Sequence, residues 1–208
     1  MTLHQLTLPS LPITAQPTYI KAALSAGKHV LSEKPIAKDV ASARELLAWY
    51  EQNIDKSKAT WGVAENFRFF ESYQWGAAKV AELGKVVSFS SKVHAYIKED
   101  NKYYAPVGIT EYRVVCERGT VTTGFGSVPM SPAYVSVKRA DSDEEERKEF
   151  PEAGFGVHLE VAAWGEKLEK GGFDERQAPK EALKDLEILE AMLKSGEQGG
   201  VPVSIHSS

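Results

Sequence analysis

Residues 1–70 alternate between two hydrophobic patterns: short apolar runs, and segments in which apolar residues recur every three or four positions. The runs at residues 3–8, 29–35 ("HVLSEKP") and 59–69 ("ATWGVAENFRF") predict three strands. The segments between them predict two helices, because their apolar residues fall on one helical face. These residues are Ile20, Ala23 and Leu24 in the first helix, and Val40, Ala43, Leu46, Leu47 and Tyr50 in the second.

Three residues mark the ends of these predicted helices. Pro17 suits a first helical turn, Gly27 suits the left-handed residue after a last turn, and Asp39 can cap the second helix. A β-α-β-α-β order with short loops favours parallel strands joined by right-handed crossovers. In such sheets ligands bind outside the carboxyl ends of the strands, which is where Glu33 and Lys34 fall.

Beyond residue 70 the pattern changes to one helix, a series of strands and two final helices. The helix is predicted at residues 73–84, and β-branched and aromatic residues predict strands within 85–99, 109–123 and 133–151. Turns at Arg118-Gly119 and in the acidic run "DSDEEE" indicate hairpins, and therefore an antiparallel sheet. The final helices are predicted within residues 156–171 and 179–196, ended by Gly171 and Gly196.

The predicted fold is therefore α/β, with a partial Rossmann-type parallel sheet followed by an α+β domain that has a largely antiparallel sheet. We expect the first domain to span residues 1–70 and the second to span residues 71–208, with the C-terminal helices returning to the first domain. The chain has 208 residues, of which 42% are hydrophobic and 26% are charged. That composition allows one sizeable core or two small ones.

Charge and cysteine content argue against several classes of partner. The 25 basic and 29 acidic side chains give a net charge of −4, which offers no general attraction for nucleic acid or an anionic membrane. We also expect no membrane insertion, because no run approaches the roughly 20 apolar residues that span a bilayer. The single cysteine, Cys116, forms neither an intramolecular disulfide nor a zinc site, so we expect a cytoplasmic protein without a metal.

Three segments carry a family resemblance: "AGKHVLSEKPIA" (26–37), "NFRF" (66–69) and "EALKDLEILEAMLKSG" (181–196). Together they are similar to the Gfo/Idh/MocA oxidoreductases, and the resemblance touches most of the chain. It implies a dinucleotide-binding domain followed by a domain built on a largely antiparallel sheet. It also implies hydride transfer between NAD or NADP and a sugar, a polyol or a related carbonyl compound.

The resemblance gives the catalytic role to Lys34. In the family the Glu-Lys-Pro signature lies beside the nicotinamide, and its lysine moves a proton on the oxygen of the carbon that exchanges hydride. A positioned ammonium can donate that proton or stabilise a developing alkoxide. Pro35 biases Lys34 towards an extended backbone, and Glu33 can pair with a cation or orient a hydroxyl. The alternative is an exposed lysine beside a loop proline, because most lysines lie on the surface.

Besides this signature, we expect Pro12, Asn66 and Arg68 to contact the cofactor. Pro12 follows the first predicted strand, and Asn66 and Arg68 lie at the end of the third. A spacing of two puts Asn66 and Arg68 on the same side of an extended backbone. The resemblance implies that such a pair shapes the nicotinamide and substrate pocket. The alternative is an inter-domain hinge in which Arg68 pairs with a carboxylate.

The chain departs from the family in two motifs. No G-x-G-x-x-G lies upstream of Pro12, and no G-G-x-x-x-D-x-G-x-H segment, which bears the family's usual aspartate and histidine, occurs. We therefore expect a shortened member in which NAD or NADP binding is weakened or lost. Two functions stay open: an oxidoreductase with a small-molecule substrate, or a non-catalytic relative that serves as an interaction or regulatory module. An open sheet edge at residues 3–8 favours a homodimer.

Overall fold

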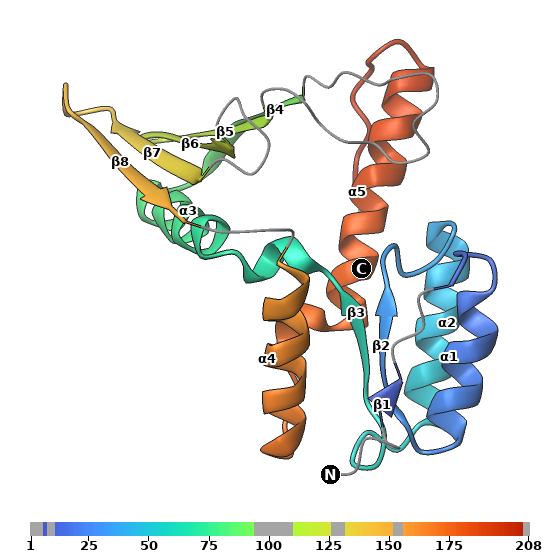
Figure 1. The fold of residues 1–208 in the computed structure, drawn as a ribbon. Helices are drawn as coiled ribbons and strands as arrows, with labels where there is room; N and C mark the ends of the chain where they lie inside the picture. The colour runs from blue at the N-terminus through green and yellow to red at the C-terminus, as the bar shows by residue number, and fades with distance from the viewer. Residues whose placement is uncertain (1–5, 8–10, 94–109, 126–131, 152–155, 206–208) are drawn as a thin grey trace, which may run out of the picture. The chain divides into compact units, whose positions relative to one another are not determined.

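The computed structural model describes residues 6–7, 11–93, 110–125, 132–151 and 156–205 (Figure 1). The chain divides into two compact units, one of residues 1–65 with 160–208 and the other of residues 66–159. A three-stranded sheet lies in the first unit and a five-stranded sheet in the second. Among the residues described, no helix is both long enough and apolar enough to cross a membrane.

The first unit contains the predicted parallel sheet. Its strands are β1 (Leu6–Thr7), β2 (His29–Glu33) and β3 (Trp61–Ala64), paired in that order and all parallel. Helix α1 (Gln16–Ser25) connects β1 to β2, and α2 (Val40–Asn53) connects β2 to β3. The predicted β-α-β-α-β order is confirmed. The outer residues of the first predicted strand, 3–5 and 8, lie outside the described residues.

Local chemistry sets the helix ends as the sequence predicts. Pro17 lies in the first turn of α1, where a missing backbone N–H costs no helical hydrogen bond. Gly27 follows the helix with φ +72°, a conformation that favours glycine. The side chain of Asp39 accepts a hydrogen bond from the backbone N–H of Ser42 at 2.7 Å, which caps α2.

The core of the first unit lies on both faces of the parallel sheet. Val30, Trp61 and Val63 are fully buried against α1, α2 and α5 (Pro179–Glu197). On the other face, Leu31 and Ala64 pack with Trp164 of α4 (Val157–Glu169). Each such side chain contributes about 1.5–3 kcal/mol when it leaves water. Burial on both faces therefore fixes the strands that carry the candidate site.

One polar contact inside this core joins β2 to β3. The indole N–H of Trp61 donates a hydrogen bond to the hydroxyl oxygen of Ser32 at 3.0 Å, and both residues are fully buried. The backbone N–H of Trp61 also donates to the hydroxyl of Tyr50 at 3.2 Å. Buried polar groups need such partners, because an unpaired donor in the core loses its hydration without replacement.

In the second unit, the 3₁₀ helix η2 (Asn66–Phe69) and helix α3 (Glu71–Leu83) precede the second sheet. Its strands are β4 (Val86–Val93), β5 (Thr110–Cys116), β6 (Gly119–Phe125), β7 (Ala133–Arg139) and β8 (Glu145–Phe150). All four pairings are antiparallel and follow chain order, so the predicted antiparallel sheet is confirmed. Helix α3 packs on one face of the sheet, over Val121, Val135 and Phe150. The predicted strand residues beyond Val93 lie outside the described residues.

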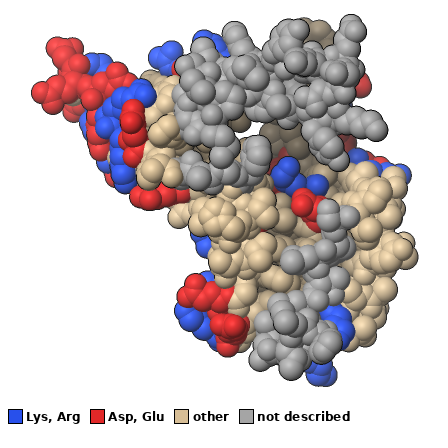
Figure 2. All heavy atoms as spheres, in the orientation of Figure 1, with Lys and Arg blue, Asp and Glu red and all other residues tan. Residues whose placement is uncertain are grey.

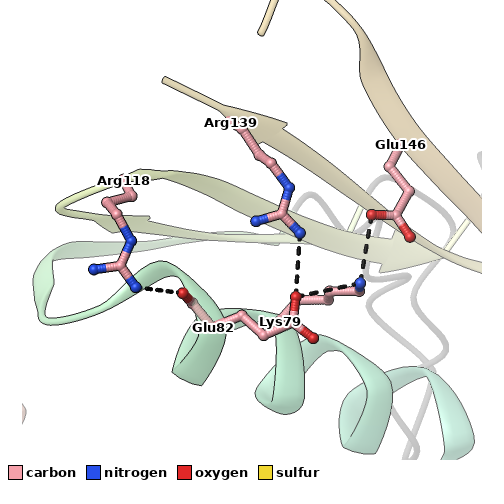
Figure 3. Close-up of polar contacts among 5 residues, drawn as sticks. All are labelled: Lys79, Glu82, Arg118, Arg139 and Glu146. Atoms are coloured by element: carbon pink, nitrogen blue, oxygen red, sulfur yellow. Dashed lines mark hydrogen bonds and ion pairs between the residues drawn. The ribbon is translucent and has the colours of Figure 1, made fainter. Parts of the chain in front are cut away.

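Charged side chains tie the C-terminal end of α3 to this sheet (Figure 3). Glu82 accepts from Arg139 at 3.1 Å, and Lys79 lies 3.4 Å from Glu82 and 3.5 Å from Glu146. The Arg139 hydrogen bond lowers the pKa of Glu82 below its ordinary value. Arg118 donates to the backbone carbonyl of Glu82. The same unit carries the acidic turn between β7 and β8, beside the basic residues of β8 (Figure 2).

Three details of the predicted elements are wrong. The third strand ends at Ala64, because the backbone turns into η2 from Asn66 onward. The β5–β6 turn is formed by Glu117 and Arg118, since Cys116 pairs with Gly119. Helix α5 runs through Gly196 to Glu197, and the left-handed glycines Gly199 and Gly200 follow it. Left-handed glycines do follow the end of α5, but they are Gly199 and Gly200 and not the predicted Gly196.

We predict that Ser32→Ala lowers the free energy of unfolding by about 1–3 kcal/mol, because the indole N–H of Trp61 then stays buried without an acceptor. Denaturant unfolding monitored by fluorescence measures the change. The matched control is Ser88→Ala in β4, where the serine is exposed. Equal effects of the two substitutions would contradict the importance of the buried hydrogen bond.

Candidate functional site

The Glu-Lys-Pro signature lies at the carboxyl end of β2. Glu33 pairs in register with Ala64, so Glu65, which follows β3, emerges at the same edge of the sheet as Lys34. Glu33, Lys34 and Pro35 are exposed, and the Lys34–Pro35 peptide bond is cis. The structure therefore presents the lysine to solvent from a fixed strand end.

Two buried residues anchor the chain directly after this signature. Ile36 and Ala37 are each 1% exposed and belong to the core that α1, α2 and α5 share. A hydrogen bond also fixes the start of α2, where the backbone N–H of Val40 donates to the Glu190 carboxylate at 3.1 Å. That bond lowers the pKa of Glu190. The backbone beneath Lys34 is thus held from both sides, although its side chain is exposed.

A groove of about 470 Å³ borders the signature. Its lining comes from the loop after β2 and from the second half of α5: Pro35, Lys38, Asp39, Leu186, Leu189, Glu190, Met192 and Leu193. Most of the α5 residues in it are apolar. The groove belongs wholly to the first unit and begins one residue after Lys34.

The structure adds one residue that the sequence analysis missed, Glu160 of α4. Its side chain is buried, with the residue only 3% exposed, and its Oε2 atom has no hydrogen-bond partner. The pKa of Glu160 is raised to about 7, chiefly by burial and next by the nearby negative charges of Glu33 and Glu65. The positive charge of Lys34 opposes this effect. The carboxyl of Glu160 therefore lies within electrostatic reach of the candidate lysine.

Periodicity could have revealed this residue. Glu160 lies four positions before Trp164 and eight before Leu168, so it falls on the apolar face of α4. An acidic residue on a buried helical face is unusual, because carboxylates are rarely fully buried without a partner. The sequence analysis considered only the apolar residues of this helix.

Gln177 fixes the backbone of Glu160 from a second element. It lies in η3 (Glu175–Gln177), is fully buried, and donates from Nε2 to the Glu160 carbonyl oxygen at 3.4 Å. Gly62 of β3 permits this close approach. A Cβ at Gly62 would lie 3.2 Å from Leu31 Cδ1 and 3.4 Å from Gln177 Cβ. The backbone of Glu160 is therefore tied to η3, which packs against β3 at Gly62.

The other predicted residues lie in the turn before α1 and in η2. Pro12 is exposed in the turn before α1, where its carbonyl oxygen accepts from the N–H groups of Ala15 and Gln16. Asn66 and Arg68 begin the second unit. The expectation that they share one side of a strand is wrong, because η2 has about three residues per turn and separates positions two apart. Asn66 is buried, whereas Arg68 is partly exposed.

The sequence comparisons agree with the predicted family. Residues 7–57 match the family described as "Oxidoreductase family, NAD-binding Rossmann fold" (GFO_IDH_MocA). The resemblance to the Gfo/Idh/MocA oxidoreductases is confirmed. The curated Dehydrogenase FPY6 of Fusarium mangiferae is 29% identical over 266 residues, which covers 90% of this chain and 74% of that protein. Since that alignment is longer than 208 residues, FPY6 contains internal segments that this chain lacks.

Solved oxidoreductase structures have the same fold as this chain. The 3-ketoreductase KijD10 of Actinomadura kijaniata, crystallised with NADP and TDP-benzene, superposes with a TM-score of 0.65 at 16% identity, covering 88% of this chain and 76% of that one. An oxidoreductase described as putative, from Klebsiella pneumoniae, gives 0.66 at 19% identity, covering 98% and 79%. At such identities the likeness shows the fold alone.

A dinucleotide fits the strand ends of this chain only in part. At these strand ends Lys34 is exposed, and the buried Oε2 atom of Glu160 has no hydrogen-bond partner. The start of α2 is less suited to a pyrophosphate, because the carboxylates of Asp39 and Glu190 already accept its N–H groups and carry negative charge. In α1, Pro17 replaces one donor. No cluster of metal-ligating side chains occurs among the described residues.

We predict that Glu160 makes the free energy of unfolding fall as pH rises. Its folded pKa, about 7, exceeds its ordinary value of 4.5, so the folded state binds more protons between these two values. Stability is therefore lost from about pH 4.5 to about pH 7. At about 1.36 kcal/mol per pKa unit, Glu160→Gln gains up to about 3 kcal/mol over wild type between pH 4.5 and pH 8. Denaturant unfolding at a series of pH values measures this gain.

The control for this prediction is Glu166→Gln on the same helix. Glu166 is exposed, and its hydrogen bond with Lys170 lowers its pKa. Its substitution should give no gain on raising the pH from 5 to 8, the range in which Glu160 titrates. A wild-type stability curve that is parallel to that of Glu160→Gln across this range would show that Glu160 does not titrate there.

Proposed function

We propose that this chain is an oxidoreductase that transfers hydride between NAD or NADP and a sugar, a polyol or a related carbonyl compound, with Lys34 handling the proton. The observation that carries the proposal is the position of Lys34. It follows a buried parallel strand, at the edge where α/β sheets of this kind bind ligands. The family match over residues 7–57 includes this position.

The proposed role of Lys34 follows from the chemistry of a carbinol carbon. A bound reduced nicotinamide supplies the hydride, and the carbonyl oxygen then needs a proton. The ammonium of Lys34 donates this proton or stabilises the developing alkoxide. Ile36 and Ala37 anchor the backbone just beyond the signature, so the backbone at Lys34 is fixed while the lysine side chain is exposed.

We further propose that Pro12, Glu33, Pro35, Asn66 and Arg68 line the cofactor site, and that the cofactor binds weakly. Backbone N–H donors and the positive end of a helix dipole hold a pyrophosphate at a helix start. The start of α2 is instead occupied by two carboxylates. Affinity then rests mainly on the nicotinamide end.

We predict that Lys34→Ala lowers the rate of the hydride step by about 10²–10⁴-fold, the usual range for loss of a general acid. Its effect on the dissociation constant for NADPH should be much smaller, since the lysine acts on the substrate oxygen. Single-turnover NADPH oxidation measures the rate, and NADPH fluorescence measures binding. The control is Lys38→Ala, an exposed lysine four residues later that pairs with Asp39.

Two results would count against this proposal. An unchanged hydride rate in Lys34→Ala would remove the lysine from its role. A failure of both NADH and NADPH to bind the purified chain at millimolar concentration would remove the enzymatic function of the chain by itself.

A second candidate function is an interaction module that forms a homodimer through a sheet. Within the described residues β4 is an outer strand of the antiparallel sheet, and Val86, Val87 and Phe89 are exposed along it. In the same way β1 is an outer strand of the parallel sheet. Outer strands present backbone groups that pair readily with another chain.

We also propose a cytoplasmic location, since the only cysteine of the chain, Cys116, is a buried free thiol.

We predict that the purified chain is a dimer in size-exclusion chromatography with light scattering. If β4 forms the contact, Val87→Lys should shift the equilibrium towards monomer, because a charged side chain on an outer strand opposes pairing. Lys92→Arg, on the same strand, serves as the control and should leave the dimer intact. A monomer at all concentrations would rule out the homodimer.

A further inference from the structure

Buried polar atoms without partners gather at one side of the parallel sheet. Among the described residues, these atoms are Glu160 Oε2, Trp164 Nε1, Gln177 Oε1 and, elsewhere, Gln16 Oε1. Three of the four belong to α4 and η3, which pack beside each other. Glu160 alone in this group carries an acidic proton. A buried carboxyl that no protein group satisfies is costly, so its presence calls for a chemical reason.

The charged groups that face Glu160 come from both strand ends. Glu33 and Lys34 follow β2, and Glu65 follows β3; these three act electrostatically on the Glu160 carboxyl. The third element packed against it, η3, contributes the uncharged Gln177. Burial and two like charges disfavour the carboxylate, whereas the lysine favours it. The charge of Glu160 is therefore coupled to the charge of Lys34.

We propose that Glu160 exchanges a proton with Lys34, so that the proton used in each turnover passes between Glu160 and the substrate oxygen through the lysine. This inference rests on the proposed function. In the reducing direction, hydride from a reduced nicotinamide adds to the carbonyl carbon, and the electron pair of the C=O π bond goes to oxygen. That oxygen takes a proton from the Lys34 ammonium. The resulting amine takes the proton of the Glu160 carboxyl, and water returns a proton to the carboxylate.

Burial distinguishes Glu160 from its two acidic neighbours. Glu33 is exposed and Glu65 is partly exposed, so water reaches both side chains. Glu160 is shielded, and giving up its proton is favourable chiefly when a positive charge lies nearby. The sequence also lacks the G-G-x-x-x-D-x-G-x-H segment that supplies the family's usual acid–base pair. A carboxyl on α4 offers the reaction another proton source.

The first test measures the titration of Glu160 by NMR of ¹³C-glutamate-labelled protein without cofactor, with Glu160→Gln used to assign its signal. We expect a pKa of about 7. Lys34→Met should raise it, because the opposing positive charge is lost, and Glu33→Gln should lower it, because a like charge is lost. Lys38→Met is the matched control and should move it less than either substitution. Thermal melting of each variant verifies that it is folded.

The second test is the pH dependence of turnover. In the wild type, the rate of carbonyl reduction should fall as pH rises through about 7, because Glu160 loses the proton that it delivers. Glu160→Gln should lower kcat and abolish this decline while leaving the KM for NADPH within about threefold. Glu160→Asp should restore part of both the rate and the pH dependence. If the role of Glu160 is purely structural, Glu160→Gln changes the free energy of unfolding and leaves the shape of the pH profile unaltered.

The outcomes separate this inference from the proposed function. A Glu160 pKa near its ordinary 4.5, or one that does not respond to Lys34→Met, overturns the inference even if the chain turns over. A coupled titration near 7 in a chain that binds neither NADH nor NADPH supports the Glu160–Lys34 pair and overturns the enzymatic function. An unaltered pH profile in Glu160→Gln overturns the proton exchange.

Discussion

The parallel pairing of β2 with β3 is the constraint on which the candidate site depends. Its register, which sets Glu33 opposite Ala64, ends both strands at the same edge. Lys34 and Glu65 therefore emerge close together, although 31 residues separate them in sequence. A slip by one residue would turn every side chain of a strand to the other face. The fully buried Val30 and Val63 on one face and the buried Leu31 and Ala64 on the other make such a slip costly.

The two faces of this sheet serve the site in different ways. On one face, α1, α2 and α5 hold the loop after β2 through Ile36 and Ala37, and give Lys34 a stable base. On the other, α4 packs Trp164 against Leu31 and carries Glu160 into the interior one turn earlier. Lys34 is therefore exposed to water, whereas Glu160 is buried, and the charge of Lys34 acts on the Glu160 carboxyl. The positive charge of Lys34 favours the ionised form of Glu160, which suits the proposed proton exchange.

Much of the fold follows from the sequence because its signals are local. Pro17, Gly27 and Asp39 mark helix ends through φ preference and side-chain capping, and β-branched and aromatic residues separated by turns give the strands of the antiparallel sheet. The third strand was extended too far because Phe67 and Phe69 continue its aromatic pattern, whereas the backbone has already turned into η2. Apolar composition alone does not distinguish a strand from a short 3₁₀ turn.

The candidate site was only half predictable for a different reason. Lys34 stands in a continuous motif, and its place at a strand end follows from the order of elements. Glu160 lies in α4, over 120 residues later in the sequence. Its raised pKa depends on its burial as α4 packs against Leu31, and on the nearby charges of Glu33 and Glu65. No local pattern encodes such long-range burial. In the sequence, only the position of Glu160 on the apolar face of a predicted helix indicates that it is buried.

The account holds that Lys34 faces the nicotinamide, and NMR of the chain labelled with ¹³C at the lysine ε-carbon tests this most directly. Adding NADPH at millimolar concentration should shift the Lys34 signal, assigned with Lys34→Met, and leave the Lys38 signal in place. If the Lys34 signal stays fixed while NADPH binds, or if both signals move equally, the lysine does not lie at the cofactor and the account is wrong.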